Sequence, residues 1–178
     1  MKKLIFVLAC ILVTSTLSAQ IKKGQWLAGG NANWTTTSQS DYSNGNSTVI
    51  SVNPDVGYFF IDKLAGGIKI NYSFINQSGG SAYNSYGFLP FVRYYVLPAD
   101  KNINVFAEVA TGWGNAYQGG YSGNSHVWSI SAGPAFFLNK HVALECALNF
   151  SNYSGSNYNS GDAQTFGMNI GFQIHLGK

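Results

Sequence analysis

Charged residues are scarce in this 178-residue sequence, and their scarcity excludes several classes of protein. Only 10% of the residues are Asp, Glu, Lys or Arg, against about 25% in an ordinary soluble domain. The formal net charge of +3 is too small for a strongly basic nucleic-acid-binding domain, so no nucleic-acid partner is expected. A hydrophobic fraction of 46%, with 15% aromatic residues, is too apolar for a disordered chain. The length suits one domain.

Long apolar runs are also missing, except at the N-terminus. Residues 4–17 form an apolar run of 14 residues, shorter than the roughly 20 that a membrane-spanning helix needs. Two lysines before the run and small residues after it predict a signal peptide over residues 1–19. Cleavage before Gln20 leaves one domain over residues 20–178. An N-terminal anchor helix and a lipoprotein signal at Cys10 are the two alternatives.

Cysteine and metal-binding patterns are equally rare. Cys146 alone remains after removal of the signal peptide, which excludes an intramolecular disulfide. The sequence has no His-x-His or Cys-x-x-Cys pair and no glycine-rich phosphate loop between a strand and a helix. We therefore predict no metal site and no cofactor.

The rest of the chain alternates between apolar residues and small or polar ones. This period of two is typical of β-strands. Each alternating segment is long enough to cross a bilayer as a tilted strand. Eight such segments are predicted, at residues 24–37, 47–60, 64–75, 85–96, 103–115, 126–137, 142–152 and 163–176.

Short and long connections alternate between these segments. The long ones, at residues 38–46, 76–84, 116–125 and 153–161, are rich in Tyr, Ser, Asn and Gly. Short turns at one end and long loops at the other indicate an all-β fold, an eight-stranded antiparallel up-and-down transmembrane β-barrel. Three strands that lead into a short turn contain a proline, at Pro54, Pro90 and Pro134. Their matching positions predict a shared bulge or kink.

The apolar faces of the segments carry many aromatic residues close to the strand ends. Two aromatic belts around an aliphatic band are typical of a barrel wall in a bilayer. A soluble barrel needs a charged outer surface, and this chain has too few charges to make one. The predicted girdle consists of Trp26, Trp34, Tyr58, Tyr72, Tyr94, Trp113, Trp128, Phe136 and Phe172.

Five charged residues fall on the opposite faces and predict a polar layer inside the barrel. Asp55 and Lys69 are symmetric about one short turn, so they are expected to face each other across the hairpin. Arg93 and Glu108 are symmetric about the next short turn and are expected to do the same. Charges in the nearly filled interior of an eight-stranded barrel must pair.

The fifth charge, Glu145, has two candidate partners in this lumen charge network. It is expected to share Arg93 or to meet His175 on the last strand. We interpret the network as a structural plug, with a proton or ion path, or a gate, as the alternative.

Three segments carry a resemblance to a known family: PDVGYFFIDK at residues 54–63, LPFVRYY at 89–95 and GFQIHL at 171–176. With these segments, residues 20–178 resemble the small outer-membrane β-barrel proteins of Gram-negative bacteria, such as the OmpA transmembrane domain, OmpX and OmpW. The chain looks most like the family called outer membrane protein beta-barrel domain. The resemblance implies export to the outer membrane. It also implies outer-membrane lipid, lipopolysaccharide and the barrel-assembly machinery as partners. Members usually end in an aromatic residue, whereas here the nearest is Phe172.

The favoured function is non-enzymatic, without catalytic residues. It is a structural or surface-interaction barrel with a polar, largely filled lumen, whose loops have the composition of adaptable recognition surfaces and would bind an extracellular ligand. The alternative is a narrow channel for ions or small solutes. A second alternative is a lipid-A-modifying enzyme, because Ser125 and His126 stand at a strand end with Asp41 or Asp162 available as the carboxylate.

Overall fold

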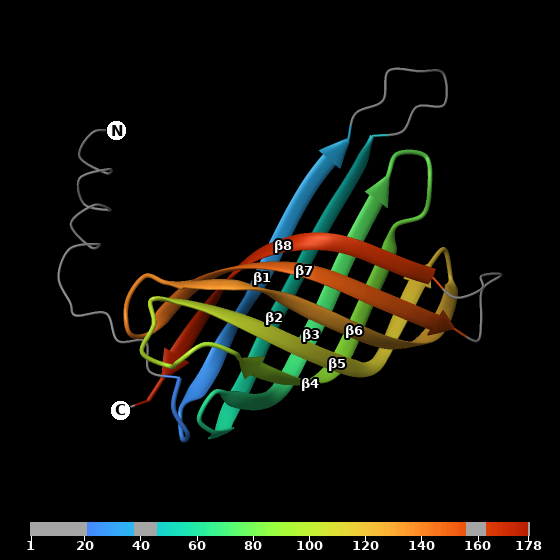
Figure 1. Cartoon of the computed structure of the whole chain (residues 1–178). Helices are drawn as coiled ribbons and strands as arrows, with labels where there is room; N and C mark the ends of the chain where they lie inside the picture. The colour runs from blue at the N-terminus through green and yellow to red at the C-terminus, as the bar shows by residue number, and fades with distance from the viewer. Residues whose placement is uncertain (1–20, 38–45, 156–162, 178) are drawn as a thin grey trace, which may run out of the picture.

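The computed structural model describes residues 21–37, 46–155 and 163–177, which form eight antiparallel strands. Each strand pairs with the next, and β8 returns to β1, so the sheet closes into a barrel (Figure 1). The predicted eight-stranded up-and-down barrel is therefore confirmed. None of the described residues forms a helix that is long and apolar enough to cross a bilayer. The strands are β1 (Trp26–Thr37), β2 (Ser47–Ile61), β3 (Leu64–Gln77), β4 (Tyr83–Tyr95), β5 (Ile103–Gln118), β6 (Tyr121–Phe137), β7 (Val142–Gly155) and β8 (Ala163–Leu176).

The alternation of the sequence becomes an alternation between the inside and the outside of the barrel. Along β5, Val105 and Val109 are exposed on the outer wall, whereas Phe106 and Glu108 between them are buried inside. Large apolar side chains cover the outer wall, the reverse of a soluble protein. All nine residues of the predicted aromatic girdle lie on this wall, and Trp34 is the most exposed of them at 76%.

The loop predicted at residues 116–125 is wrong, because β5 and β6 continue through it. A two-residue turn, Gly119-Gly120, joins the strands, and both glycines have positive φ, 57° and 88°. A two-residue hairpin needs this conformation at both positions, and glycine adopts it without steric cost. The next-longest predicted loop within the described residues shrinks to 78–82. The predicted loops at 38–46 and 153–161 lie largely outside the described residues.

A bulge, one of the two features predicted at the three prolines, does not occur there, and the kink stays a prediction. The register is continuous past Pro54, Pro90 and Pro134. Each proline instead interrupts the pairing with one neighbouring strand, because it has no N–H to donate. The single shift between β2 and β3 lies at Phe59 and Ile61, beside the turn.

Next to one of these interruptions, Gly133 on β6 lies against the backbone of β7. A Cβ on Gly133 would come 1.9 Å from the carbonyl oxygen of Cys146, whereas a Cβ on Gly167 of β8 would meet nothing within 4 Å. We expect Gly133→Ala to lower the free energy of unfolding by about 1–3 kcal/mol through overpacking. Gly167→Ala, the matched control, should change it little. Urea unfolding of the refolded proteins measures both, and equal effects would contradict the close approach.

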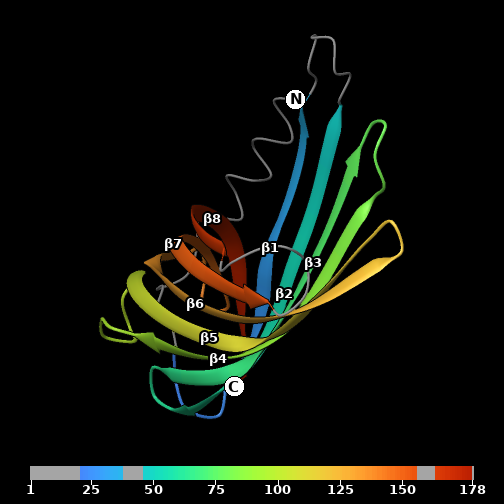
Figure 2. The same cartoon turned by 90° about the vertical axis from the view of Figure 1, so that its right-hand side faces the viewer.

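The β1–β8 pairing is much shorter than the others. It joins Trp26–Gly30 to residues 172–176, five pairs in all, whereas β1 and β2 pair over all twelve residues of β1. Beyond Gly30 the two strands diverge, and Figures 1 and 2 show the far halves of β1–β3 leaning away from β7 and β8. The barrel is therefore closed at its short-turn end and split at the other.

Candidate functional site

The short-turn end of the barrel is filled by a layer of large apolar side chains, here called the floor. Tyr95 stands in its centre, with ring centroids 6.0 Å from Phe59 and 6.2 Å from Phe106. Leu27 and Ile21 complete the layer, and all five side chains are at most 1% exposed. The floor arises because inward positions near the short turns are aromatic or aliphatic. Buried side chains therefore pack together across this end of the lumen.

His175 belongs to the floor, which corrects its predicted place in the charge network. Its ring lies 5.2 Å from that of Phe137, 5.6 Å from Phe59 and 5.8 Å from Tyr95, centroid to centroid. Neither ring nitrogen has a hydrogen-bond partner among the described residues. His175 lies two residues closer to the end of β8 than Gln173 does. Gln173 is level with the charge network and bonds to Asp55, whereas His175 is level with the floor.

The charge network lies directly above the floor and is centred on Arg93. Its Nη2 is 2.7 Å from Oε2 of Glu108, the cross-strand neighbour that the hairpin symmetry predicts. Its Nη1 is 3.1 Å from both carboxylate oxygens of Glu145 on β7. The guanidinium also stacks on Phe106, 4.6 Å from the ring centroid. Arg93 thus pairs with two carboxylates while its guanidinium packs on a ring of the floor. Of the two partners predicted for Glu145, Arg93 and His175, the structure shows Arg93.

Asp55 and Lys69 behave differently from their predicted pairing. They are cross-strand partners by register, but the Lys69 ammonium forms its ion pair with Glu108. The Asp55 carboxylate instead accepts two hydrogen bonds from Nε2 of Gln173, each 3.0 Å long. Asp55 is therefore the one carboxylate of the network that has no ion pair among the described residues.

The five charges leave the network with one more carboxylate than cation. Charges removed from water are stable only when they are paired and hydrogen-bonded. Arg93, Glu108 and Glu145 meet that condition and are at most 5% exposed. Asp55 and Lys69 both line the space above the network, so an unpaired carboxylate and a partly exposed ammonium face the same cavity.

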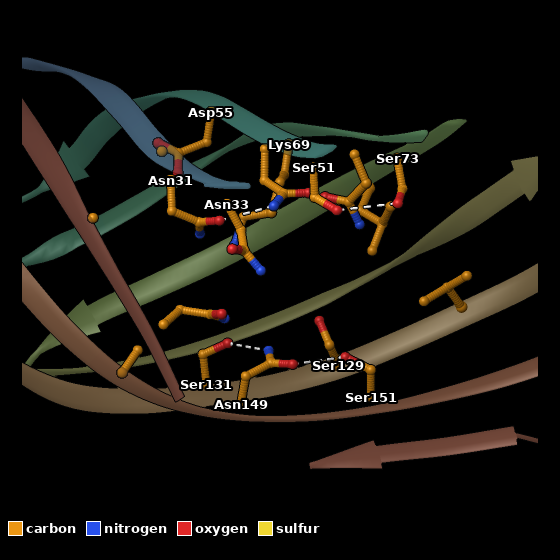
Figure 3. Close-up of a pocket in the computed structure, with 18 of the residues that line it drawn as sticks. Asn31, Asn33, Ser51, Asp55, Lys69, Ser73, Ser129, Ser131, Asn149 and Ser151 are labelled. Carbon is orange, nitrogen blue, oxygen red and sulfur yellow. Dashed lines mark hydrogen bonds between the residues drawn. The ribbon is translucent and has the colours of Figure 1, made fainter. Parts of the chain in front are cut away.

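Above the network the lumen opens into a polar chamber of about 600 Å³. The five charges lie among its lining residues, together with many amides and hydroxyls. Some of these polar side chains bond to each other across neighbouring strands, as Figure 3 shows for Ser51 with Ser73 and for Asn149 with Ser131, and Ser151 donates to Asn149 along β7. Asn53 of β2 donates to Asn31 of β1 at 2.8 Å. The lumen is therefore open above the charge network, which corrects the prediction of a largely filled interior.

The candidate enzyme residues are not assembled into a catalytic site within the described residues. The His126 imidazole lies on the outer wall, with Nε2 3.1 Å from the Thr111 hydroxyl and its ring beside Trp113. Within the part of the chain that the structure describes, no carboxylate forms a hydrogen bond or ion pair with His126, and Asp41 and Asp162 lie outside that part. The described residues also contain no group of three His, Cys, Asp or Glu side chains that could hold a metal ion.

A closed eight-stranded antiparallel barrel with an apolar outer wall and a polar interior has the fold of small outer-membrane β-barrel proteins. The chain is similar to the crystal structure of Neisserial surface protein A (NspA), with a TM-score of 0.65 and 12% identity over 85% of this chain and 97% of that one. It is also similar to the outer membrane protein OprG from Pseudomonas aeruginosa, with a TM-score of 0.51 and 9% identity over 88% and 98%. No family model and no curated protein matches the sequence. These likenesses show the fold, and the finer resemblance to OmpA, OmpX and OmpW stays a prediction.

Proposed function

We propose that this protein is a non-conducting, non-enzymatic barrel of the bacterial outer membrane that acts through surface interaction. The apolar outer wall and its aromatic girdle support the membrane location, because such a surface is stable only in lipid. The signal peptide predicted over residues 1–19 provides the route of export. The short turns then lie in the periplasm, and the polar chamber opens toward the outside of the cell.

The observation that carries the proposal is the sealed lower half of the lumen. Two successive layers fill it, the floor around Tyr95 and the network around Arg93. Ions crossing the barrel would have to displace fully buried rings and break ion pairs, both of which cost several kcal/mol. The chamber above is therefore a blind pocket, suited to binding rather than to passage.

Single-channel recording tests this proposal directly. We expect the refolded protein to show no conductance steps in planar bilayers, because both sealing layers persist in the folded barrel. Heat-modifiable migration in gels confirms that the protein added to the bilayer is folded. Steady conductance of the folded protein would overturn the proposal and favour the channel alternative.

A further inference from the structure

The gap between β1 and β8 joins the polar chamber to the outer wall. Above the last pair, Gly30 with Phe172, residues 31–37 of β1 and 163–171 of β8 have no partner strand on their facing edges among the described residues. Both edges line the chamber, β1 through Asn31 and Asn33, and β8 through Asn169 and others. In a bilayer, such unpaired backbone groups are unstable unless a polar partner satisfies them.

A second, apolar groove lies on the outer wall at the same place. It has a volume of about 480 Å³ and is lined largely by aliphatic and aromatic side chains. The groove and the chamber share three lining residues, Gly30, Asn31 and Gly171. The groove is further lined by Ala32, Val52, Pro54, Ile170, Phe172 and Ile174.

Glycine at the fork of the two strands allows their backbones to approach each other closely. A Cβ on Gly171 would come 2.6 Å from the carbonyl oxygen of Gly30, and a Cβ on Gly30 would come 2.2 Å from that of Asn53. Gly30 also has φ of 131°, a conformation that favours glycine. The two backbones are therefore in close contact at the fork, and Asn31, directly above it, contributes to the lining of both the polar chamber and the apolar groove.

The charges nearest the fork are of both signs. Asp55 is the cross-strand partner of Gly29 on β1, next to the fork, and its carboxylate forms no ion pair with any described residue. Lys69 is the cross-strand partner of Asp55 on β3, and its side chain is 18% exposed. A headgroup that carries an ammonium and a phosphate matches this pair, whereas a purely anionic headgroup leaves Asp55 uncompensated.

We propose that the β1–β8 gap binds one single-chain zwitterionic lipid of the surrounding membrane, a lysophospholipid with an ammonium headgroup. The headgroup lies in the chamber, with its ammonium at Asp55 and its phosphate toward Lys69. The acyl chain leaves the chamber beside Asn31, between the diverging strand edges above the fork, and lies in the outer groove, whose volume is that of a pocket for one small ligand. Headgroup oxygens and the ammonium satisfy the free strand edges. The inference rests on the proposed non-conducting barrel and names the ligand of its chamber.

Closing the gap with a disulfide tests the route of the chain. In the register continued from Gly30 and Phe172, Asn33 lies opposite Asn169, so the variant carries Asn33→Cys and Asn169→Cys with Cys146→Ser. Native mass spectrometry of the refolded protein, titrated with lysophosphatidylethanolamine, reports one-to-one binding. We expect oxidation to weaken binding at least tenfold and reduction to restore it.

The matched control places a disulfide across a seam that is already paired. Thr36 and Thr48 are cross-strand partners on the outer wall of β1 and β2. Oxidation of Thr36→Cys with Thr48→Cys, again with Cys146→Ser, should leave binding unchanged. Equal binding by the oxidised and reduced forms of the Asn33 and Asn169 variant would overturn the proposal, as would failure of the wild-type protein to bind.

The headgroup preference supplies a test that does not depend on disulfide formation. We expect the wild-type protein to bind lysophosphatidylethanolamine at least tenfold more tightly than lysophosphatidylglycerol of the same chain length, and Asp55→Asn to remove most of that difference. Equal binding of the two lipids by the wild-type protein would overturn the proposal. These outcomes are separate from conductance, so a silent barrel that ignores the lipid contradicts only this inference.

Discussion

Arg93→Ala should lower the free energy of unfolding by about 3–5 kcal/mol. Two carboxylates, Glu108 and Glu145, depend on the guanidinium, and both are buried. Removing Arg93 leaves Glu145 with Tyr95 as its one remaining side-chain partner among the described residues. Glu108 keeps its ion pair with Lys69, whereas Glu145 has no second cation among the described residues. A buried charge without a partner costs more than the ion pair contributes. The variant also loses the contact of the guanidinium with Phe106.

Urea unfolding of protein refolded into lipid vesicles, followed by tryptophan fluorescence, measures this effect. Lys101→Ala is the matched control, because this cation lies exposed in a short turn, where a substitution changes stability by about 0.5 kcal/mol or less. A triple variant, Arg93→Met with Glu108→Gln and Glu145→Gln, should recover much of the loss because no buried charge of the trio remains. If Arg93→Ala unfolds at the same urea concentration as Lys101→Ala, the network does not hold the barrel together.

Most of the fold is readable from the sequence because a barrel wall obeys a local rule. Side chains alternate between two environments at every step, so the period of two predicts the strands and their inward faces. Hairpin symmetry then predicts cross-strand partners such as Arg93 and Glu108, since a short turn determines the register of the strands that it joins. The same parity identifies the floor, because Phe59 is on the same face of β2 as Asp55.

Partners across the lumen follow no such local rule. Lys69 reaches Glu108 rather than Asp55, and Arg93 reaches Glu145, more than fifty positions away in the sequence. These choices depend on the strand tilt and stagger of the closed sheet, which bring distant strands to the same height. The short β1–β8 pairing has the same origin, because no turn joins the first strand to the last and so none determines where their pairing ends.

The hairpin at Gly119-Gly120 shows a different limit. A run of Gly, Tyr, Ser and Asn resembles a long loop by composition, although the glycine pair is itself a signal for a two-residue turn. In the structure the glycine pair forms this turn, and β5 and β6 extend up to it on either side. Composition therefore overestimated the length of this loop.

Removing the floor should convert a silent barrel into a conducting one. Phe59→Ala together with Tyr95→Ala deletes two rings that pack on each other and on His175. Water then reaches the network from the periplasmic side, and hydrated charges exchange partners with mobile ions. We expect discrete single-channel steps in planar bilayers, with a preference for cations because the network carries one more carboxylate than cation.

The neighbouring residues provide a control of nearly identical composition. Phe60 and Tyr94 are adjacent to the floor residues in sequence but lie exposed on the outer wall, so Phe60→Ala with Tyr94→Ala deletes the same two ring types and leaves the seal intact. That variant should stay silent, like the wild-type protein. Each floor substitution costs about 3–5 kcal/mol, so heat-modifiable migration must show that the inward variant is folded before its recording is interpreted. If the folded Phe59→Ala, Tyr95→Ala variant shows no conductance, the prediction is wrong. The Arg93 network alone would then be enough to block ions after the floor has been removed.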